Sequence, residues 1–448
     1  MHGFAEPQAL VPPSHRLNLF QRMMLRWRSL HPYNPVHVVR IAAALDAARL
    51  QSLIQGELEA TGLTGLELSA DGTHARWRGG PAQVVLQRLA PRPTAQDALH
   101  AAIEQSFNEP FVRGAAGDPF RFFVIDEGEG FSLGLAYDHF VAGGDAIAVL
   151  LSEIALAYLG SGKTRPALHA GTRPRTYRHL LANHPAWTAH ALAGLPRMAA
   201  SSRRASRTPM ADVEDGRNGY ASLSLKAGET RALLASAKAW GVTLNDLLLA
   251  ALLLVLAPRS AASRSAARRN ELAVASIMNI RRDFADAAST WPSPCLAALR
   301  VGHAVPEGVG LQALATDVHV RTTAIKHEHL YLQSLLALGL TSLAWRWLKP
   351  HQRHAWLPKH YPTAAGVTTL NLNPLWSGAD PAVAARLDYL RAVPTGPLCP
   401  IVLAATTAHG ILHLGLSYRC TAYTAEEMTR LTEDLHACLL PALCEDAR

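Results

Sequence analysis

The stretch LAYDHFVAGGD, residues 135–145, holds a histidine where an apolar run gives way to two glycines. The preceding residues alternate as a strand would, and Gly143 and Gly144 allow the chain to turn after it. Imidazole titrates near neutral pH, so a histidine at a strand end can accept a proton from a hydroxyl or an amine. His139 is therefore a candidate general base, while a polar residue that merely ends a strand fits the same pattern.

Strands and helices of a similar kind surround His139 and recur in the second half of the chain. A chain of 448 residues exceeds what one hydrophobic core usually organises, which favours two lobes of about 200 residues each. We therefore expect a mixed α/β fold in two lobes. The predicted division is 1–160 for the lobe with His139, 161–217 for a basic linker, and 218–448 for the second lobe.

The formal charge of +8 is concentrated in that linker. Between residues 160 and 217, basic residues outnumber acidic ones by roughly three to one. A solvated linker explains this excess, and so does a docking face for a carrier protein, a phosphate-rich thioester or an anionic membrane surface. Nucleic acid is excluded as a partner because the basic residues are not interleaved with aromatic ones.

Other features of the composition favour a cytoplasmic protein. The five cysteines form no CxxC pair, the N-terminus lacks the apolar core of a signal peptide, and no apolar run reaches 18 residues. No metal site is suggested. The amphipathic stretch at 16–30 is interpreted as a helix of the first lobe, with peripheral membrane contact as the alternative.

The residues YDHFVAGGDAIAVLLSEI resemble the HHxxxDG region of a large acyltransferase superfamily. That superfamily includes chloramphenicol acetyltransferase, the condensation domains of nonribosomal peptide synthetases, wax ester synthases and plant BAHD acyltransferases. The second, catalytic histidine of the motif falls on His139 and its glycine on Gly144. Other segments resemble the superfamily in the same order along the chain: 107–125, 240–257, 274–283 and 412–435.

The resemblance implies two chloramphenicol acetyltransferase-like lobes that form a V-shaped pseudo-dimer with a tunnel between them. It further implies that an acyl thioester and an acceptor enter the tunnel from opposite sides and meet at His139.

This chain differs from the motif at two positions. Asp138 stands where the motif has its first histidine, and Gly143 stands where it has its aspartate. In the family that aspartate is held by an arginine of an early helix, and the predicted helix at 45–61 has none at the corresponding place. We therefore expect both partners of the ion pair to be missing. Asp145 either caps the following helix or restores the anchor with another cation. Asp138 and His139 should point to opposite faces of the strand.

The strand predicted at 366–372 resembles the one that approaches the tunnel in this family. Alternation places Thr369, Asn371 and Asn373 on one face. We expect that face to line the tunnel and supply oxyanion or substrate contacts, with ordinary strand and turn polarity as the alternative.

The combined expectation is an acyltransferase in lipid or secondary-metabolite biosynthesis. Its donor would be acyl-coenzyme A or the phosphopantetheine of an acyl carrier protein, its acceptor a hydroxyl or amine on a small molecule or lipid. No cofactor would be permanently bound, and the protein would be a monomer. The alternative is a catalytically inactive condensation-like module that recruits a carrier protein or a tailoring enzyme.

Overall fold

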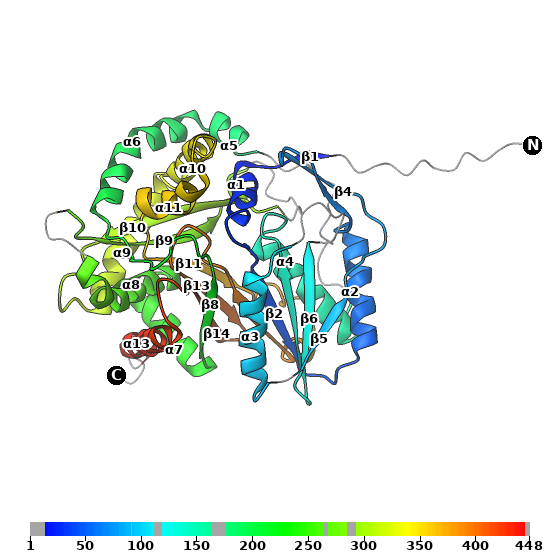
Figure 1. The fold of residues 1–448 in the computed structure, drawn as a ribbon. Helices are drawn as coiled ribbons and strands as arrows, with labels where there is room; N and C mark the ends of the chain where they lie inside the picture. The colour runs from blue at the N-terminus through cyan, green and yellow to red at the C-terminus, as the bar shows by residue number, and fades with distance from the viewer. Residues whose placement is uncertain are drawn as a thin grey trace, which may run out of the picture.

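The structure is a computed structural model that describes residues 14–90, 92–111, 119–162, 176–263, 268–284 and 293–443. Two halves lie side by side, and each is built around a sheet with helices packed on it (Figure 1). The predicted mixed α/β fold is confirmed. Part of the segment matched at 107–125 and part of the predicted linker lie outside the described residues.

The first half is built on a five-stranded sheet with the order β12-β2-β7-β6-β5. Every residue of β7 is buried, which explains its nearly continuous apolar sequence. Helices α3 and α4 pack on this sheet, and α2 packs on α4. The strands are β2 (Val36–Ile41), β5 (Leu86–Leu89), β6 (Phe120–Asp126), β7 (Phe131–Tyr137) and β12 (Leu387–Ala392), and the helices are α2 (Ala47–Thr61), α3 (Ala95–Asn108) and α4 (Gly144–Tyr158).

A three-stranded sheet and a short helix complete this half. The sheet has the order β1-β4-β3, and helix α1 buries Met23, Met24 and Trp27 in the core. The apolar face of α1 therefore packs inside the protein, as expected for a first-lobe helix. The elements are β1 (His15–Arg16), β3 (Leu66–Leu68), β4 (His74–Trp77) and α1 (Leu19–Arg28).

The second half is built on a six-stranded sheet with the order β10-β9-β11-β13-β14-β8. Helix α8 is apolar on all sides and lies in the centre of its core. The strands are β8 (Asn218–Leu225), β9 (Leu272–Asn279), β10 (Leu296–His303), β11 (Ala365–Asn371), β13 (Ile401–Ala408) and β14 (Ile411–Arg419), and the helices are α7 (Ala227–Ala239), α8 (Leu244–Leu256), η1 (Pro258–Ser263), η2 (Arg281–Asp283), α9 (Leu311–His327), α10 (Leu332–Ala344), α11 (Pro350–His360), α12 (Pro381–Ala384) and α13 (Ala425–Leu443).

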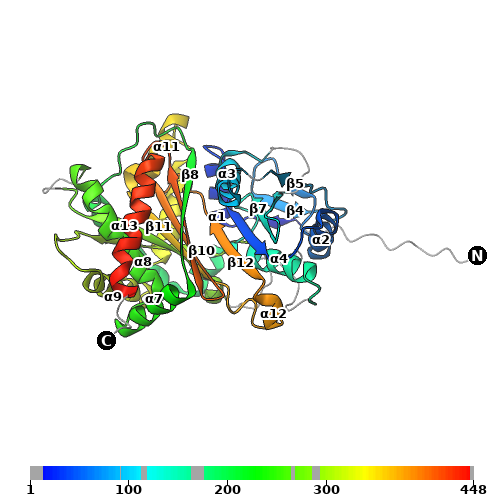
Figure 2. The ribbon, with the colours of Figure 1, turned by 90° about the horizontal axis from the view of Figure 1, so that it is seen from below.

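Strand β12 crosses from the second half of the chain into the sheet of the first. It pairs antiparallel with β2, and Arg391 lies opposite His37 in the register. Figure 2 shows β12 beside the strands of the first half. The sequence analysis predicted no strand at 387–392 and assigned these residues to the second lobe.

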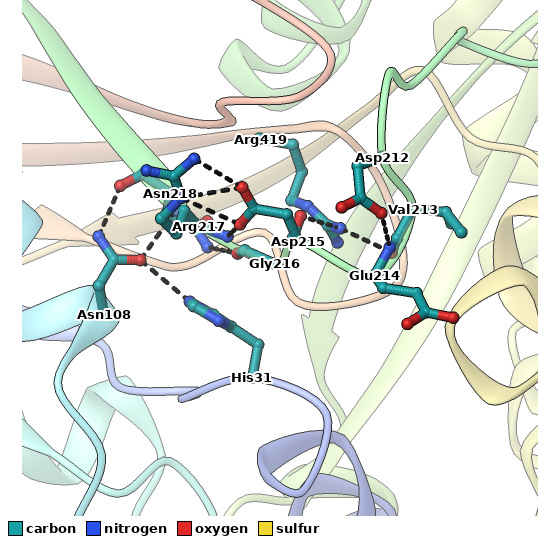
Figure 3. A network of polar contacts seen from close by, with 10 residues as sticks. All are labelled: His31, Asn108, Asp212, Val213, Glu214, Asp215, Gly216, Arg217, Asn218 and Arg419. Carbon is teal, nitrogen blue, oxygen red and sulfur yellow. Dashed lines mark hydrogen bonds and ion pairs between the residues drawn. The ribbon is translucent and has the colours of Figure 1, made fainter. Parts of the chain in front are cut away.

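The described part of the basic segment 161–217 is largely helical. It forms α5 (Tyr177–Asn183) and α6 (Pro185–Arg204), and α6 packs against α10 (Figure 1). Its end is held between the two halves by a polar network (Figure 3). Asn218 exchanges backbone hydrogen bonds with the Asn108 side chain at 2.8 and 2.9 Å, and Arg419 donates to the Asp215 carbonyl at 2.7 Å.

Within the described ranges, no single helix is long and apolar enough to cross a membrane. Helices α7 and α8 meet the length and composition criteria only as a pair, and that pair is bent by 97°.

Candidate active site

His139 lies immediately after β7, in a tight turn. Its backbone N–H donates to the Tyr33 carbonyl at 3.3 Å, and the Val141 N–H donates to the Asp138 carbonyl at 3.0 Å. The imidazole packs against the rings of Tyr33 and Tyr137, with centroids 5.2 and 5.8 Å away. The side chain is therefore held by aromatic packing.

The imidazole of His139 lines a cavity of about 410 Å³ between the two halves. The lining is mostly apolar, as in small-molecule sites. Among the described residues, no three His, Cys, Asp or Glu side chains are grouped as a metal site. Both halves contribute to the wall, with Tyr33, His37 and Tyr137 from the first and Ala275, Thr368 and Leu296 from the second.

Burial in this wall lowers the pKa of His139 to about 4. Backbone groups of Ala142 and of His139 itself oppose part of the lowering, and the nearby Arg391 adds to it. The imidazole is therefore neutral at pH 7. A neutral imidazole can accept a proton without first losing one, as a general base requires.

Asp138 points away from His139 and forms an ion pair with Arg28, the last residue of α1. The guanidinium of Arg28 also lies 5.4 Å from the centre of the Phe140 ring. Burial raises the pKa of Asp138 to about 6 even though Arg28 opposes the shift. This pair joins the first position of the motif to α1, and it is not the pair between the motif aspartate and its arginine, whose loss the sequence predicted.

Helix α1 supports the histidine turn through a second residue. The side-chain amide of Gln21 donates to the Phe140 carbonyl at 2.9 Å and to the Ser293 hydroxyl at 3.0 Å. Asn18, which caps the same helix, donates to the Pro294 carbonyl at 3.0 Å. The N-terminus of α1 thus connects the histidine turn to the second half.

Asp145 connects the same turn to β9. Its carboxylate accepts a hydrogen bond from Asn279 at 2.8 Å and lies 3.6 Å from the guanidinium of Arg281. A Cβ at Gly143 would lie only 2.5 Å from this carboxylate, so an aspartate at 143 would collide with it. Asp145 thus has a cationic partner in the other half, in addition to lying in the first turn of α4.

A row of polar side chains continues from His139 across the sheet. Tyr137 lies two residues before His139, and His37 and Arg391 follow on neighbouring strands. Nδ1 of His37 lies 2.8 Å from the Tyr389 hydroxyl, and Arg391 lines the cavity. Sequence reasoning missed this row. The sequence did contain a signal for it. The buried strands VHVVRI and LDYLRA each place an ionisable residue, His37 and Arg391, at an inward position.

The beginning of β11 lines the cavity, at Gly366, Val367 and Thr368, and the predicted residues farther along do not. Thr368 lines the cavity, whereas Thr369 and Asn371 are exposed and do not. Asn373 accepts a hydrogen bond from the His409 backbone at 2.9 Å in a turn after the strand. The prediction for Thr369, Asn371 and Asn373 was therefore wrong for this cavity, because only the first residues of the strand reach it.

Comparisons with known proteins identify the fold. No protein-family model and no curated protein sequence matches the chain. Among solved structures, the first condensation domain of the CDA synthetase is similar with a TM-score of 0.69 and 14% identity, covering 96% of this chain and 97% of that one. Polyketide synthase associated protein 5 from Mycobacterium tuberculosis is similar with a TM-score of 0.64 and 15% identity, over 97% and 100% of the two chains.

The X-domain from teicoplanin biosynthesis, solved in a complex with OxyB, is similar with a TM-score of 0.58 and 14% identity, over 99% and 96% of the chains. Identities this low establish the fold alone, and these proteins differ in their roles. The chain therefore has the condensation-domain fold of two chloramphenicol acetyltransferase-like halves, with His139 in the wall of the cavity between them.

Proposed function

We propose that this protein is an acyltransferase in which His139 acts as the general base. The observation that carries the proposal is a buried, neutral imidazole in the wall of a mostly apolar cavity between the two halves. His139 would remove a proton from an acceptor hydroxyl or amine, which attacks an acyl thioester. The products are an ester or amide and a free thiol, which takes up the proton.

A thioester on coenzyme A or on the phosphopantetheine of a carrier protein is the donor in this proposal. Arg197 on α6 is exposed and also lines the cavity, so it belongs to the cavity's outer part. Arg203 and Arg207 are exposed farther along the same segment. Such a basic surface suits the phosphates of coenzyme A or the acidic surface of a carrier protein, and salt would weaken its effect.

The test is transfer activity of the His139→Ala variant with acyl thioesters and hydroxyl or amine acceptors. General-base catalysis typically contributes a hundred to ten-thousand-fold, so we expect kcat to fall by about that range. His100→Ala is the matched control, because His100 is also partly buried but bonds to Ser222 outside the cavity. Full activity of a folded His139→Ala protein would remove His139 from this role.

A second candidate is a non-catalytic module that binds a partner protein. It is favoured by Asp138 and Gly143 at altered motif positions and by the similarity to the X-domain solved with OxyB. Under this alternative, no thioester is consumed with any acceptor, and a carrier protein or tailoring enzyme binds equally well to the wild type and to His139→Ala. Calorimetric binding and product mass spectrometry on the same preparations distinguish the two candidates.

A further inference from the structure

Arg391 is a buried cation whose hydrogen-bonding capacity is only partly used. Its residue is 4% exposed. Nε donates to the Thr406 hydroxyl at 3.0 Å, and Nη2 donates to the carbonyls of Ala405 at 3.0 Å and Thr368 at 3.2 Å. These three contacts fix the plane of the guanidinium. Among the described residues, none accepts a hydrogen bond from Nη1, and Arg391 lines the cavity.

The charge of Arg391 also has no ion-pair partner among the residues that the structure describes. The carboxylate that raises its pKa belongs to Asp145, and that carboxylate is already bound by Asn279 and faces Arg281. Burial lowers the pKa of Arg391 to about 10, so the group is still charged at pH 7. An uncompensated buried charge is strongly unfavourable, so an anion bound at this guanidinium would stabilise it.

His37 supplies a second unused polar atom at the same place. Its residue is fully buried, and no described residue forms a hydrogen bond with Nε2. Nδ1 lies 2.8 Å from the Tyr389 hydroxyl. When this hydroxyl donates to Nδ1, the ring proton is on Nε2, which then is a donor.

These two groups converge on the turn that carries His139. A Cβ built on Gly144 would lie 3.4 Å from Nη1 of Arg391 and 3.5 Å from Nε2 of His37. Both atoms therefore face the same small volume, and the absence of a side chain at Gly144 keeps that volume open. His37 and Arg391 lie opposite each other in the β2–β12 register, so the sheet itself sets their separation.

We propose that Arg391 and His37 form a subsite for a carboxylate group of the substrate, next to the reacting atoms at His139. A carboxylate can accept hydrogen bonds from Nη1 of the fixed guanidinium and from Nε2 of His37, and burial makes such a charge-assisted contact stronger than it would be in water. The inference rests on the proposed acyl transfer and narrows its substrate class. Either the acceptor is an amino or hydroxy acid, or the acyl chain of the donor carries a second carboxyl group.

The first experiment measures binding and needs no turnover. Acetate and acetamide have nearly the same shape and differ in charge, so they probe the subsite without knowledge of the substrate. We expect acetate, at constant ionic strength, to bind at least tenfold more tightly than acetamide in calorimetric titrations. Arg391→Gln should abolish the preference, and Arg391→Lys should keep part of it, because a lysine retains the charge and loses the planar fork.

Arg300→Gln is the matched control. Arg300 lines the same cavity, is also held by neutral acceptors on Ser201 and Pro362, and lies near Glu271. The acetate preference should persist in this variant. Circular dichroism checks that each variant is folded, and His37→Gln provides a second test with a smaller change in charge.

The second experiment identifies which substrate carries the carboxylate. One pair of acceptors is glycine and glycinamide, and one pair of donors is glutaryl-pantetheine and its monoamide. In one of these pairs the wild type should prefer the compound with the carboxylate, and Arg391→Gln should not. That pair shows whether the acceptor or the donor carries the carboxylate. If the folded wild type binds acetate no more tightly than acetamide, or if Arg391→Gln still prefers acetate, the subsite is refuted. If acetate binding depends on Arg391 while no thioester is consumed, the subsite stands and the acyltransferase proposal fails.

Discussion

At the scale of single residues, burial determines which side chains of the histidine turn carry charge. His139 is neutral because its ring is packed between Tyr33 and Tyr137, away from water. Asp138 is equally buried but has Arg28 beside it. The two neighbours in sequence thus have different environments, one beside a guanidinium and the other between two aromatic rings.

The lowered pKa of His139 predicts the pH dependence of the proposed reaction. A proton on the imidazole blocks the base, so kcat/KM should stay constant from pH 8 to about 5 and fall with an apparent pKa of about 4. Because the folded pKa lies below the unfolded value, His139 also contributes stability above pH 6.5 that is lost as pH falls toward 4.

Nuclear magnetic resonance of the histidine ring protons measures this pKa directly, with His139→Gln assigning the signal. A His139 signal that titrates near pH 6.5 in the folded protein would contradict the predicted neutral environment.

The Arg28–Asp138 pair predicts that replacing one partner lowers the free energy of unfolding much more than replacing both. Arg28→Met leaves the Asp138 carboxylate buried without a cation, and we expect the free energy of unfolding to fall by about 3–5 kcal/mol. Replacing both residues, as Arg28→Met with Asp138→Leu, should cost much less. Urea unfolding at pH 7 gives both values. Equal losses in the single and double variants would show that the pair does not anchor the turn.

At the scale of elements, helix ends position the site. Helix α1 contacts the histidine turn through Gln21 near its beginning and through Arg28 at its end. Helix α8 begins at a capping box in which Thr243 and Asp246 bind each other's backbone N–H. Asp246 of that box is fully buried, whereas Thr243 is exposed.

The burial of Asp246 leads to a prediction of how much this helix cap contributes to the free energy of unfolding. Its carboxylate is fully buried and accepts hydrogen bonds from the hydroxyls of Thr243 and Thr322, both at 2.6 Å. Asp246→Ala removes the cap and leaves the fully buried Thr322 hydroxyl without its acceptor, so we expect the free energy of unfolding in urea to fall by about 3 kcal/mol.

The exposed pair of Thr94 and Asp97 at the start of α3 is the control for this cap. Asp97→Ala should cost no more than about 1 kcal/mol because water replaces the lost partner. Similar losses in the two variants would mean that burial does not strengthen the cap of α8.

At the scale of the whole molecule, β12 makes the two halves interdependent. This strand follows most of the second half in sequence and completes the sheet of the first. Without it, β2 would be an edge strand with unpaired backbone groups and an exposed apolar face.

The crossover predicts that the first lobe does not fold independently. A fragment of residues 14–162 should lack cooperative thermal unfolding and should aggregate. The same fragment joined by a flexible linker to residues 381–394 should show a cooperative transition in circular dichroism. A folded, monomeric fragment without β12 would contradict this dependence.

Sequence reasoning reached the fold and one residue of the site. The two-lobed α/β arrangement followed from hydrophobic periodicity and the ordered motifs, and His139 from a strand that ends before two glycines. The strand at 387–392 was missed because only tertiary pairing makes it one. The contact of β11 with the cavity was misplaced because alternation does not say which residues along a strand reach the other half.

The sequence alone predicted many of the strands and helices, and it placed a histidine at the end of a buried strand. Local propensity and capping act between residues a few positions apart, so they are readable in the chain. The tertiary structure alone decided that Arg28 meets Asp138 and that Arg391 meets His37. Those contacts join residues more than a hundred positions apart and depend on strand register and on the crossover of β12, which no local pattern encodes.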